Sequence, residues 1–129
     1  MTSNDCPCGS GLSYSACCRP LHLGAPAPTA EALMRSRYSA FALGLEAYLL
    51  SSWHPSTRPA RLELDDATVW RRLQIVDTVA GGPGEQTGVV EFRASFRDAD
   101  GATGLLHERS RFAREAGRWT YVDGDMLSD

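Results

Sequence analysis

The sequence of 129 residues has no lysine, no long hydrophobic run and no excess of positive charge. All thirteen basic residues are arginines, so a lysine Schiff base or general-base amine is excluded. The net charge of −3 gives no bulk attraction to phosphate backbones, and nucleic acid is not expected as a partner. The most apolar stretch, residues 40–50, contains Glu46 and is too short to span a bilayer, so no membrane contact is expected.

The first residues also lack the basic and apolar regions of a secretory signal. Together these absences predict a cytoplasmic protein. The composition, with 43% hydrophobic and 22% charged residues, is that of an ordinary globular chain. In a reducing compartment, clustered cysteines indicate a metal or redox site before they indicate disulfides.

All the cysteines of the chain lie in its first eighteen residues, where they follow the pattern C-x-C-x8-C-C around a glycine-rich turn. The four are Cys6, Cys8, Cys17 and Cys18. Soft thiolates in two close pairs suit the tetrahedral coordination of Zn²⁺. The segment has too little apolar content to fold alone, so bound zinc would supply its folding energy. Two alternatives stay open: a redox or disulfide pair, and His22 as a substitute ligand.

The remainder of the chain predicts an α+β domain. Residues 19–29 are rich in proline and glycine and form a connector, so we divide the chain into a knuckle at 1–24 and a domain at 25–129. Helices are expected from Thr29 as N-cap, over about 45–53 and over about 66–72. The alternating segments 73–79, 88–97, 103–114 and 118–123 then predict an antiparallel meander.

One charged residue, Arg37, falls on the apolar face of the first predicted helix. A buried guanidinium needs carboxylate or carbonyl partners, and Glu108 is the first choice and Asp123 the second. Such a set could line a ligand pocket, or it could be a structural ion pair between helix and sheet. The candidate pocket residues are Arg37, Tyr38, Trp53, His54, Glu108, Ser110 and Asp123.

Histidine chemistry has weak support in the sequence. His54 could act as a base at the pocket mouth, or it could cap the C-terminus of its helix. His107 alternates with Glu108 along one strand, so the two should face opposite sides of the sheet. No Ser/His/Asp or Cys/His arrangement follows from the spacing, and no catalytic residue is predicted.

Segments of the chain resemble the bacterial YchJ family of uncharacterised proteins. The cysteine segment resembles the SEC-C motif, a zinc-binding segment also found in the translocase ATPase SecA. The other matching segments are residues 33–41, 52–55, 107–112 and 119–124. The resemblance implies a nuclear-transport-factor-2-like domain, in which N-terminal helices pack on a curved antiparallel sheet to form a cystatin-like cone. It also implies that Cys6, Cys8, Cys17 and Cys18 are the zinc ligands.

The expected function is therefore binding without catalysis. The zinc knuckle would contact a protein partner, and the attached domain would hold a small ligand. The alternative is a small-molecule enzyme of the isomerase or dehydratase type, because this kind of fold hosts such enzymes around polar pockets. Fold alone does not choose between the two.

Overall fold

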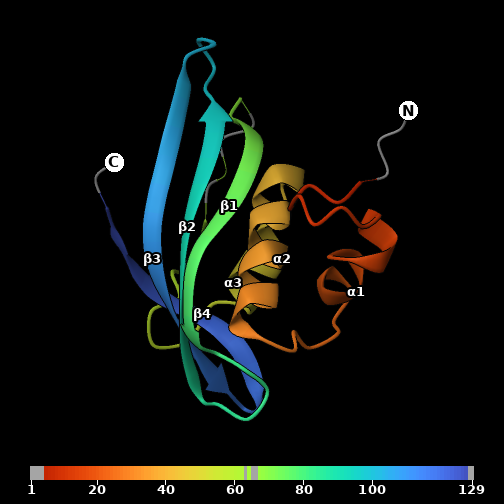
Figure 1. The fold of residues 1–129 in the computed structure, drawn as a ribbon, viewed down its shortest axis with the longest axis vertical. Helices are drawn as coiled ribbons and strands as arrows, with labels where there is room; N and C mark the ends of the chain where they lie inside the picture. Colours follow the sequence, from red (N-terminus) through yellow and green to blue (C-terminus); the bar gives the residue numbers. More distant parts are fainter. Residues whose placement is uncertain (1–4, 63, 65–66, 128–129) are drawn as a thin grey trace.

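The computed structural model describes residues 5–62, 64 and 67–127, and Figure 1 shows them in three layers. A curved sheet forms one side, α2 and α3 lie against it, and the N-terminal segment packs on α2 from the other side. The four strands are antiparallel in the order β1-β2-β3-β4. The elements are η1 (Tyr14–Ala16), α1 (Arg19–His22), α2 (Ala30–Leu43), α3 (Glu46–Ser51), β1 (Val69–Ala80), β2 (Thr87–Arg97), β3 (Thr103–Glu115) and β4 (Arg118–Met126). The predicted α+β fold, with helices on a curved antiparallel sheet, is confirmed.

The central helix α2 begins where the sequence predicts. The Thr29 hydroxyl accepts a hydrogen bond from the backbone N–H of Ala32 at 3.0 Å, as an N-cap does. Gly44 ends the helix in the left-handed region, with φ of 75°, which glycine adopts at little cost. Both faces of α2 are buried: Tyr38 is 3% exposed and Ser39 is fully buried. The helix therefore has a partner layer on each side.

The alternation along β2 places its apolar residues on the concave face of the sheet, toward α2. Val90, Phe92 and Ala94 are at most 5% exposed. On β3, Phe112 is 1% exposed and pairs with Gly88 of β2 and Tyr121 of β4. These residues form the core face of the predicted meander.

The helix expected over residues 66–72 is wrong where the structure describes it. Residue 66 lies outside the described residues, and β1 already begins at Val69. A register shift between Trp70 and Arg72 breaks the alternation of the strand. Trp70 and Leu73 both turn inward with two exposed arginines between them, and this spacing of three resembles a helix.

The helix expected over residues 45–53 is shorter in the structure and ends at Ser51. The chain after it lies along β4, because the backbone N–H of His54 donates to Tyr121 O at 2.7 Å and Tyr121 N–H donates to Ser52 O. A backbone bridge joins Trp53 and Tyr121. This pairing brings the end of α3 to the middle of β4.

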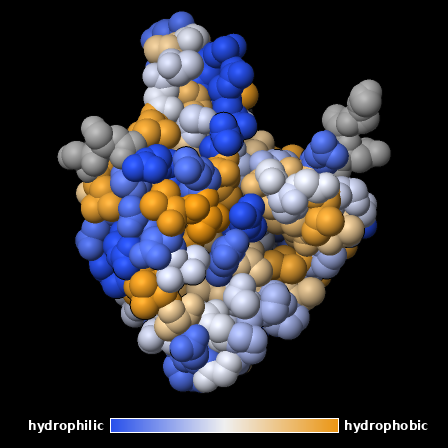
Figure 2. Space-filling view, in the orientation of Figure 1, coloured by the Kyte–Doolittle hydropathy of each residue, from blue (hydrophilic) through white to orange (hydrophobic). Residues whose placement is uncertain are grey.

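The surface mixes hydrophobic and hydrophilic residues, as Figure 2 shows for one face. The exposed large hydrophobic residues include Leu12 at 53% and Leu23 at 70%, both in the N-terminal segment. Among the residues that the structure describes, no helix is both long and apolar enough to cross a bilayer.

Candidate metal centre and ligand cavity

The four cysteines meet at one point beside α2. Their Sγ atoms all lie within 4.8 Å of one another. The separation is 3.6 Å between Cys8 and Cys17, and 3.9 Å between Cys17 and Cys18. A tetrahedron with metal–sulfur bonds of about 2.3 Å has edges of about 3.8 Å. The donor set and its spacing therefore fit a tetrahedral thiophilic metal ion such as Zn²⁺.

The local chain conformation explains how two distant pairs converge. Gly9 and Gly11 adopt φ of 79° and 87°, which residues with a side chain rarely adopt. Between them the chain reverses, and the Cys6 N–H donates to Leu12 O at 2.9 Å. The second pair lies in the turn between the short helices, with Cys17 as the C-cap of η1 and Cys18 as the N-cap of α1. The glycine-rich turn thus brings the first pair of thiols onto the second.

The electrostatics of the cysteine cluster favour a cation at its centre. A hydrogen bond from the Cys18 thiol lowers the pKa of Cys8 to about 4, with smaller contributions from Ser10 and Cys17. The same hydrogen bond, with burial, raises the pKa of Cys18. The Cys8 thiolate therefore opposes the ionisation of Cys18, and a bound metal ion would displace that proton.

Residues of α2 hold the cluster in place from the domain side. The Ser39 hydroxyl lies 3.3 Å from Cys18 Sγ and 3.5 Å from Cys6 Sγ. Arg35 donates to the carbonyl oxygen of Cys8 at 3.1 Å and brings a positive charge toward the thiolates. Neither residue was predicted to support the cluster. Their one sequence signal is that they lie within residues 33–41, which carry the family resemblance.

His22 is not a metal ligand in this arrangement. Its Nε2 donates to Ser36 O at 2.8 Å, so its Nδ1 accepts from the Tyr14 hydroxyl at 2.6 Å. The Ser36 hydroxyl in turn lies 2.6 Å from the Tyr48 hydroxyl on α3. His22 therefore ties the knuckle to both helices. The division of the chain at residues 24 and 25 stays a prediction, although the two parts share this interface.

A cavity of about 190 Å³ lies between the other face of α2 and the concave side of the sheet. Five of the seven predicted pocket residues line it: Arg37, Tyr38, Trp53, Glu108 and Ser110. Most of the remaining lining is aromatic or aliphatic: Met34, Phe41, Trp70, Phe92, Ala94, Leu106 and Tyr121. The arrangement is an apolar pocket with one cation and one carboxyl group.

Arg37 is buried as predicted, with 3% exposure, but its predicted carboxylate partner is wrong. Its Nη1 donates to Leu49 O at 2.8 Å and to the Ser52 hydroxyl at 2.6 Å. Within the described part of the chain, no carboxylate oxygen lies within 4.0 Å of the guanidinium. The partners come from the end of α3, whose last carbonyls carry partial negative charge. Burial lowers the pKa of Arg37 to about 10, so it stays charged at neutral pH.

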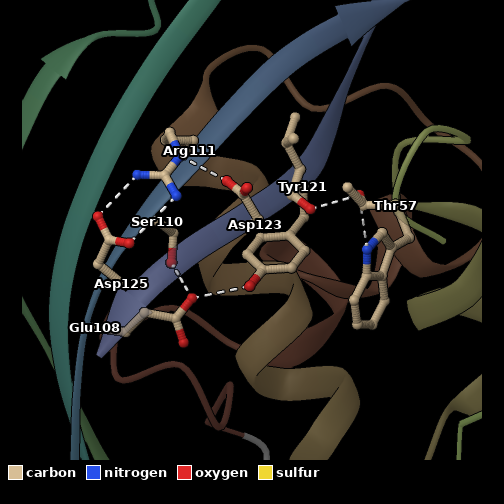
Figure 3. A network of polar contacts seen from close by, with 9 residues as sticks. Thr57, Glu108, Ser110, Arg111, Tyr121, Asp123 and Asp125 are labelled. Atoms are coloured by element: carbon tan, nitrogen blue, oxygen red, sulfur yellow. Dashed lines mark hydrogen bonds and ion pairs between the residues drawn. The ribbon is translucent and has the colours of Figure 1, made fainter. Parts of the chain in front are cut away.

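Glu108 enters the same cavity from β3 (Figure 3). Its Oε2 accepts hydrogen bonds from the Ser110 hydroxyl at 2.8 Å and from the Tyr121 hydroxyl at 2.9 Å. Its Oε1 makes no hydrogen bond to any described residue. Figure 3 shows the carboxyl group pointing toward these two hydroxyls. Two donors thus orient one oxygen and leave the other available.

Asp123 lies on the opposite face of the sheet, contrary to the prediction. It accepts from Arg111 Nε at 2.6 Å, and Asp125 binds the same guanidinium (Figure 3). Arg111 pairs with Asp123 while Phe112 pairs with Tyr121, so Val122 is an extra residue on β4. This bulge reverses the alternation after Tyr121, and the sequence shows no sign of it.

His54 is also outside the cavity lining. Its Nε2 lies 3.4 Å from Glu115 Oε1, and its Nδ1 accepts from the Ser56 N–H at 3.1 Å. Both ring nitrogens face the loop after α3 and the end of β3. Neither the capping role nor the role as a pocket base matches this position. His107 lies on the sheet face away from Glu108, as predicted, with its Nε2 2.7 Å from Glu91.

Replacing Gly124 with alanine is expected to displace the carboxyl group of Glu108. A Cβ at this position would lie 2.8 Å from Glu108 Cδ, closer than real contacts allow. The carboxylate would move and lose its hydrogen bonds to Tyr121 and Ser110, at a cost of about 1–3 kcal/mol in the free energy of unfolding. Urea denaturation measures this loss.

Two controls isolate the cause. A Cβ at Gly84 would meet no atom within 4 Å, so Gly84→Ala should change stability by less than about 0.5 kcal/mol. In a Glu108→Ala background, Gly124→Ala should be equally mild, because no carboxyl group is left to displace. A full cost in that background would show that the backbone of Gly124, and not Glu108, limits the position.

Comparison with known proteins gives consistent matches over both parts of the chain. The family model described as "YchJ, middle NTF2-like domain" matches residues 29–124, and the SEC-C motif matches residues 3–20. A UPF0225 protein of Streptomyces coelicolor is 55% identical over 128 residues, which cover 98% of this chain and 99% of that protein. A UPF0225 protein of Corynebacterium efficiens is 52% identical, over 94% of this chain and 92% of that protein.

A solved structure shows the same arrangement. The solution structure of a SEC-C motif containing protein from Rhodopseudomonas palustris superposes with a TM-score of 0.82 at 35% identity. The superposition covers 95% of this chain and 98% of the other. The similarity therefore extends over the knuckle and the domain together.

Proposed function

Since this chain belongs to the UPF0225 (YchJ) family and combines a SEC-C motif with a nuclear-transport-factor-2-like domain, we propose that it is a zinc-stabilised binding protein for a small molecule. The zinc ion, held by the four cysteines, stabilises the knuckle on α2. The cavity on the other side of α2 receives the ligand. The observation that carries this proposal is the cavity of about 190 Å³, which is lined by both Arg37 and Glu108.

The cavity has the features of a small-molecule site. Its wall is mostly apolar, and a few polar groups converge on it, as in ligand pockets generally. A purely structural ion pair would bring the two charges into contact. Instead, each group has its own hydrogen-bond partners: Leu49 and Ser52 for Arg37, and Ser110 and Tyr121 for Glu108. Both charged groups thus keep hydrogen-bonding capacity for a ligand.

The test is whether one-ring probes enter the cavity. Benzyl alcohol, benzoate and benzylamine are titrated into the zinc-loaded protein, and the amide resonances of Phe92 and Glu108 are followed by NMR. We expect at least one probe to shift them at millimolar concentration. Ala94→Leu should abolish the shifts because it fills the cavity, whereas Ala99→Leu on the exposed β2–β3 turn should not. If none of the probes shifts these resonances, the proposal is wrong.

A protein partner at the knuckle is a second function, and one feature favours it. A groove of about 540 Å³ runs between residues 21–27, α3 and β4, and Leu23 is exposed at its edge. Leu23→Asp should remove a partner that the wild type retains in a pull-down, and so should chelation of the metal. Retention of the same proteins by all three forms would contradict this role.

An isomerase or dehydratase activity remains the alternative to simple binding. Glu108 favours it, because a carboxylate among aromatic rings can serve as a general base. Against a histidine-based reaction, His54 lies outside the cavity lining. Conversion of a bound ligand into a product by the wild type, but not by Glu108→Gln, would establish an enzymatic activity.

A further inference from the structure

We propose that the cavity between α2 and the sheet binds a small monocyclic carboxylate, whose carboxyl group is held by the Nε–Nη2 edge of Arg37. This inference rests on the proposed function, because it names the chemical class of the ligand for that cavity. It follows from three properties of the described residues: the unused hydrogen bonds of Arg37, the size of the cavity and the position of Glu108.

The guanidinium of Arg37 uses only one of its nitrogens for hydrogen bonds to described residues. Nη1 donates to Leu49 O and to the Ser52 hydroxyl. The guanidinium carbon lies 5.1 Å from the ring centroid of Trp53 and 4.7 Å from that of Tyr121. The aromatic rings contact the guanidinium, and Nε and Nη2 have no hydrogen-bond acceptor among the residues that the structure describes.

A carboxylate matches this vacant edge in charge and shape. Nε–H and one Nη2–H point in parallel and can bind both oxygens of a carboxylate at once. A buried cation without an ionic partner is costly, and Arg37 is only 3% exposed. An anionic ligand would supply the missing partner. A phosphate would also be anionic, but the apolar wall offers it no further described cation.

The size of the cavity limits the ligand to about one ring. Apolar cavities of about 150 Å³ are known to hold benzene, and this cavity measures about 190 Å³. The difference is about the volume of a carboxyl group or of one or two small substituents. Six aromatic side chains line the space and suit the faces and edges of a flat ring: Tyr38, Phe41, Trp53, Trp70, Phe92 and Tyr121.

Glu108 determines which substituents the ligand can carry besides its carboxyl group. Glu108 is the one acidic residue among the described residues that line the cavity. Its Oε1 is available to accept a hydrogen bond from a ligand, because Ser110 and Tyr121 both donate to Oε2. A second carboxylate on the ligand would be repelled there. A hydroxyl or amino substituent would donate to it. The favoured ligand is therefore a monocarboxylate with a donor substituent, such as a hydroxybenzoate.

Isothermal titration calorimetry of the wild type tests the charge preference. Benzoate should bind about 10–150-fold more tightly than benzyl alcohol, the range expected for hydrogen bonds to a charged group. Benzylamine, of the same size and opposite charge, should bind more weakly than both. One of the hydroxybenzoate isomers should bind more tightly than benzoate.

Variants of Arg37 and Glu108 test which residue produces the preference for a carboxylate and which the preference for a hydroxyl substituent. Arg37→Met should remove the preference for benzoate over benzyl alcohol, so that the two probes bind with about equal affinity. Arg37→Lys keeps the positive charge but lacks the pair of parallel N–H donors. It should therefore retain only part of the difference in affinity between benzoate and benzyl alcohol. Glu108→Gln should tighten benzoate binding and remove the preference for a hydroxyl substituent. NMR spectra confirm that each variant is folded.

The outcomes separate this inference from the proposed function. If benzyl alcohol binds as tightly as benzoate, the cavity is a binding site but the carboxylate assignment is wrong. If benzylamine binds most tightly, Glu108 and not Arg37 anchors the ligand, and the assignment is again wrong. If none of the probes binds, the proposed function fails and the inference fails with it.

Discussion

Replacing Cys8 with serine is expected to abolish stoichiometric zinc binding and to destabilise the whole protein. The wild type should contain about one zinc ion per chain, and the variant close to none. A ligand that binds only the folded state stabilises it by about 4 kcal/mol when its free concentration is about a thousand times its dissociation constant. Loss of the ion removes that contribution. Elemental analysis and urea denaturation measure the two effects.

The effect should extend beyond the knuckle because the cysteine cluster is part of the core. Cys8 is fully buried, and Ser39 of α2 contacts both Cys6 and Cys18. The unfolding midpoint reported by the fluorescence of Trp70, at the far face of α2, should therefore fall.

Ser13→Ala is the matched control. Ser13 is exposed in the same segment, and its hydroxyl makes no capping hydrogen bond. This variant should keep both the metal and the stability of the wild type. If Cys8→Ser retains the metal, the metal centre is refuted. It is also refuted if the wild-type protein contains no metal and all four of its thiols can be titrated.

Replacing Phe112 with alanine is expected to lower the free energy of unfolding by about 3–5 kcal/mol. Phe112 is 1% exposed, and its ring lies 5.8 Å from that of Tyr121. The two residues face each other across β3 and β4, so truncation leaves a cavity that the rigid sheet cannot close. Equilibrium denaturation in urea, with zinc present, measures the loss.

Leu105→Ala on the same strand is the control. Leu105 is 49% exposed, so its removal should change stability by less than about 0.5 kcal/mol. A cost for Phe112→Ala below about 1 kcal/mol would mean that the concave face of the sheet is not the core, and the assignment of the cavity would fail with it.

Local patterns in the sequence were sufficient to predict the elements that depend on near neighbours. Four thiols within eighteen residues have few chemical uses, and the structure brings them within 4.8 Å of one another. Thr29 is the N-cap of α2, as predicted, because capping depends on adjacent backbone groups. The alternation from Val90 to Phe96 predicted a strand because one face of the sheet is buried.

Register irregularities limited the prediction of the site. Asp123 was expected in the pocket beside Arg37, and one extra residue in β4, Val122, turns it to the opposite face of the sheet. The shift near Trp70 likewise made part of β1 resemble a helix. Bulges are set by pairing with another strand, so a single strand's sequence does not reveal them.

The sequence by itself determined the α+β class, the cysteine donor set and the burial of Arg37, since these follow from residue type and helical or strand period. Only the tertiary structure decided what the buried groups contact. The end of α3 supplies the acceptors of Arg37, Tyr121 and Ser110 orient Glu108, and Ser39 supports the cysteines. Except for Ser110, which lies two residues from Glu108, these contacts join residues at least 12 positions apart, and their geometry depends on how α2 packs between the sheet and the knuckle.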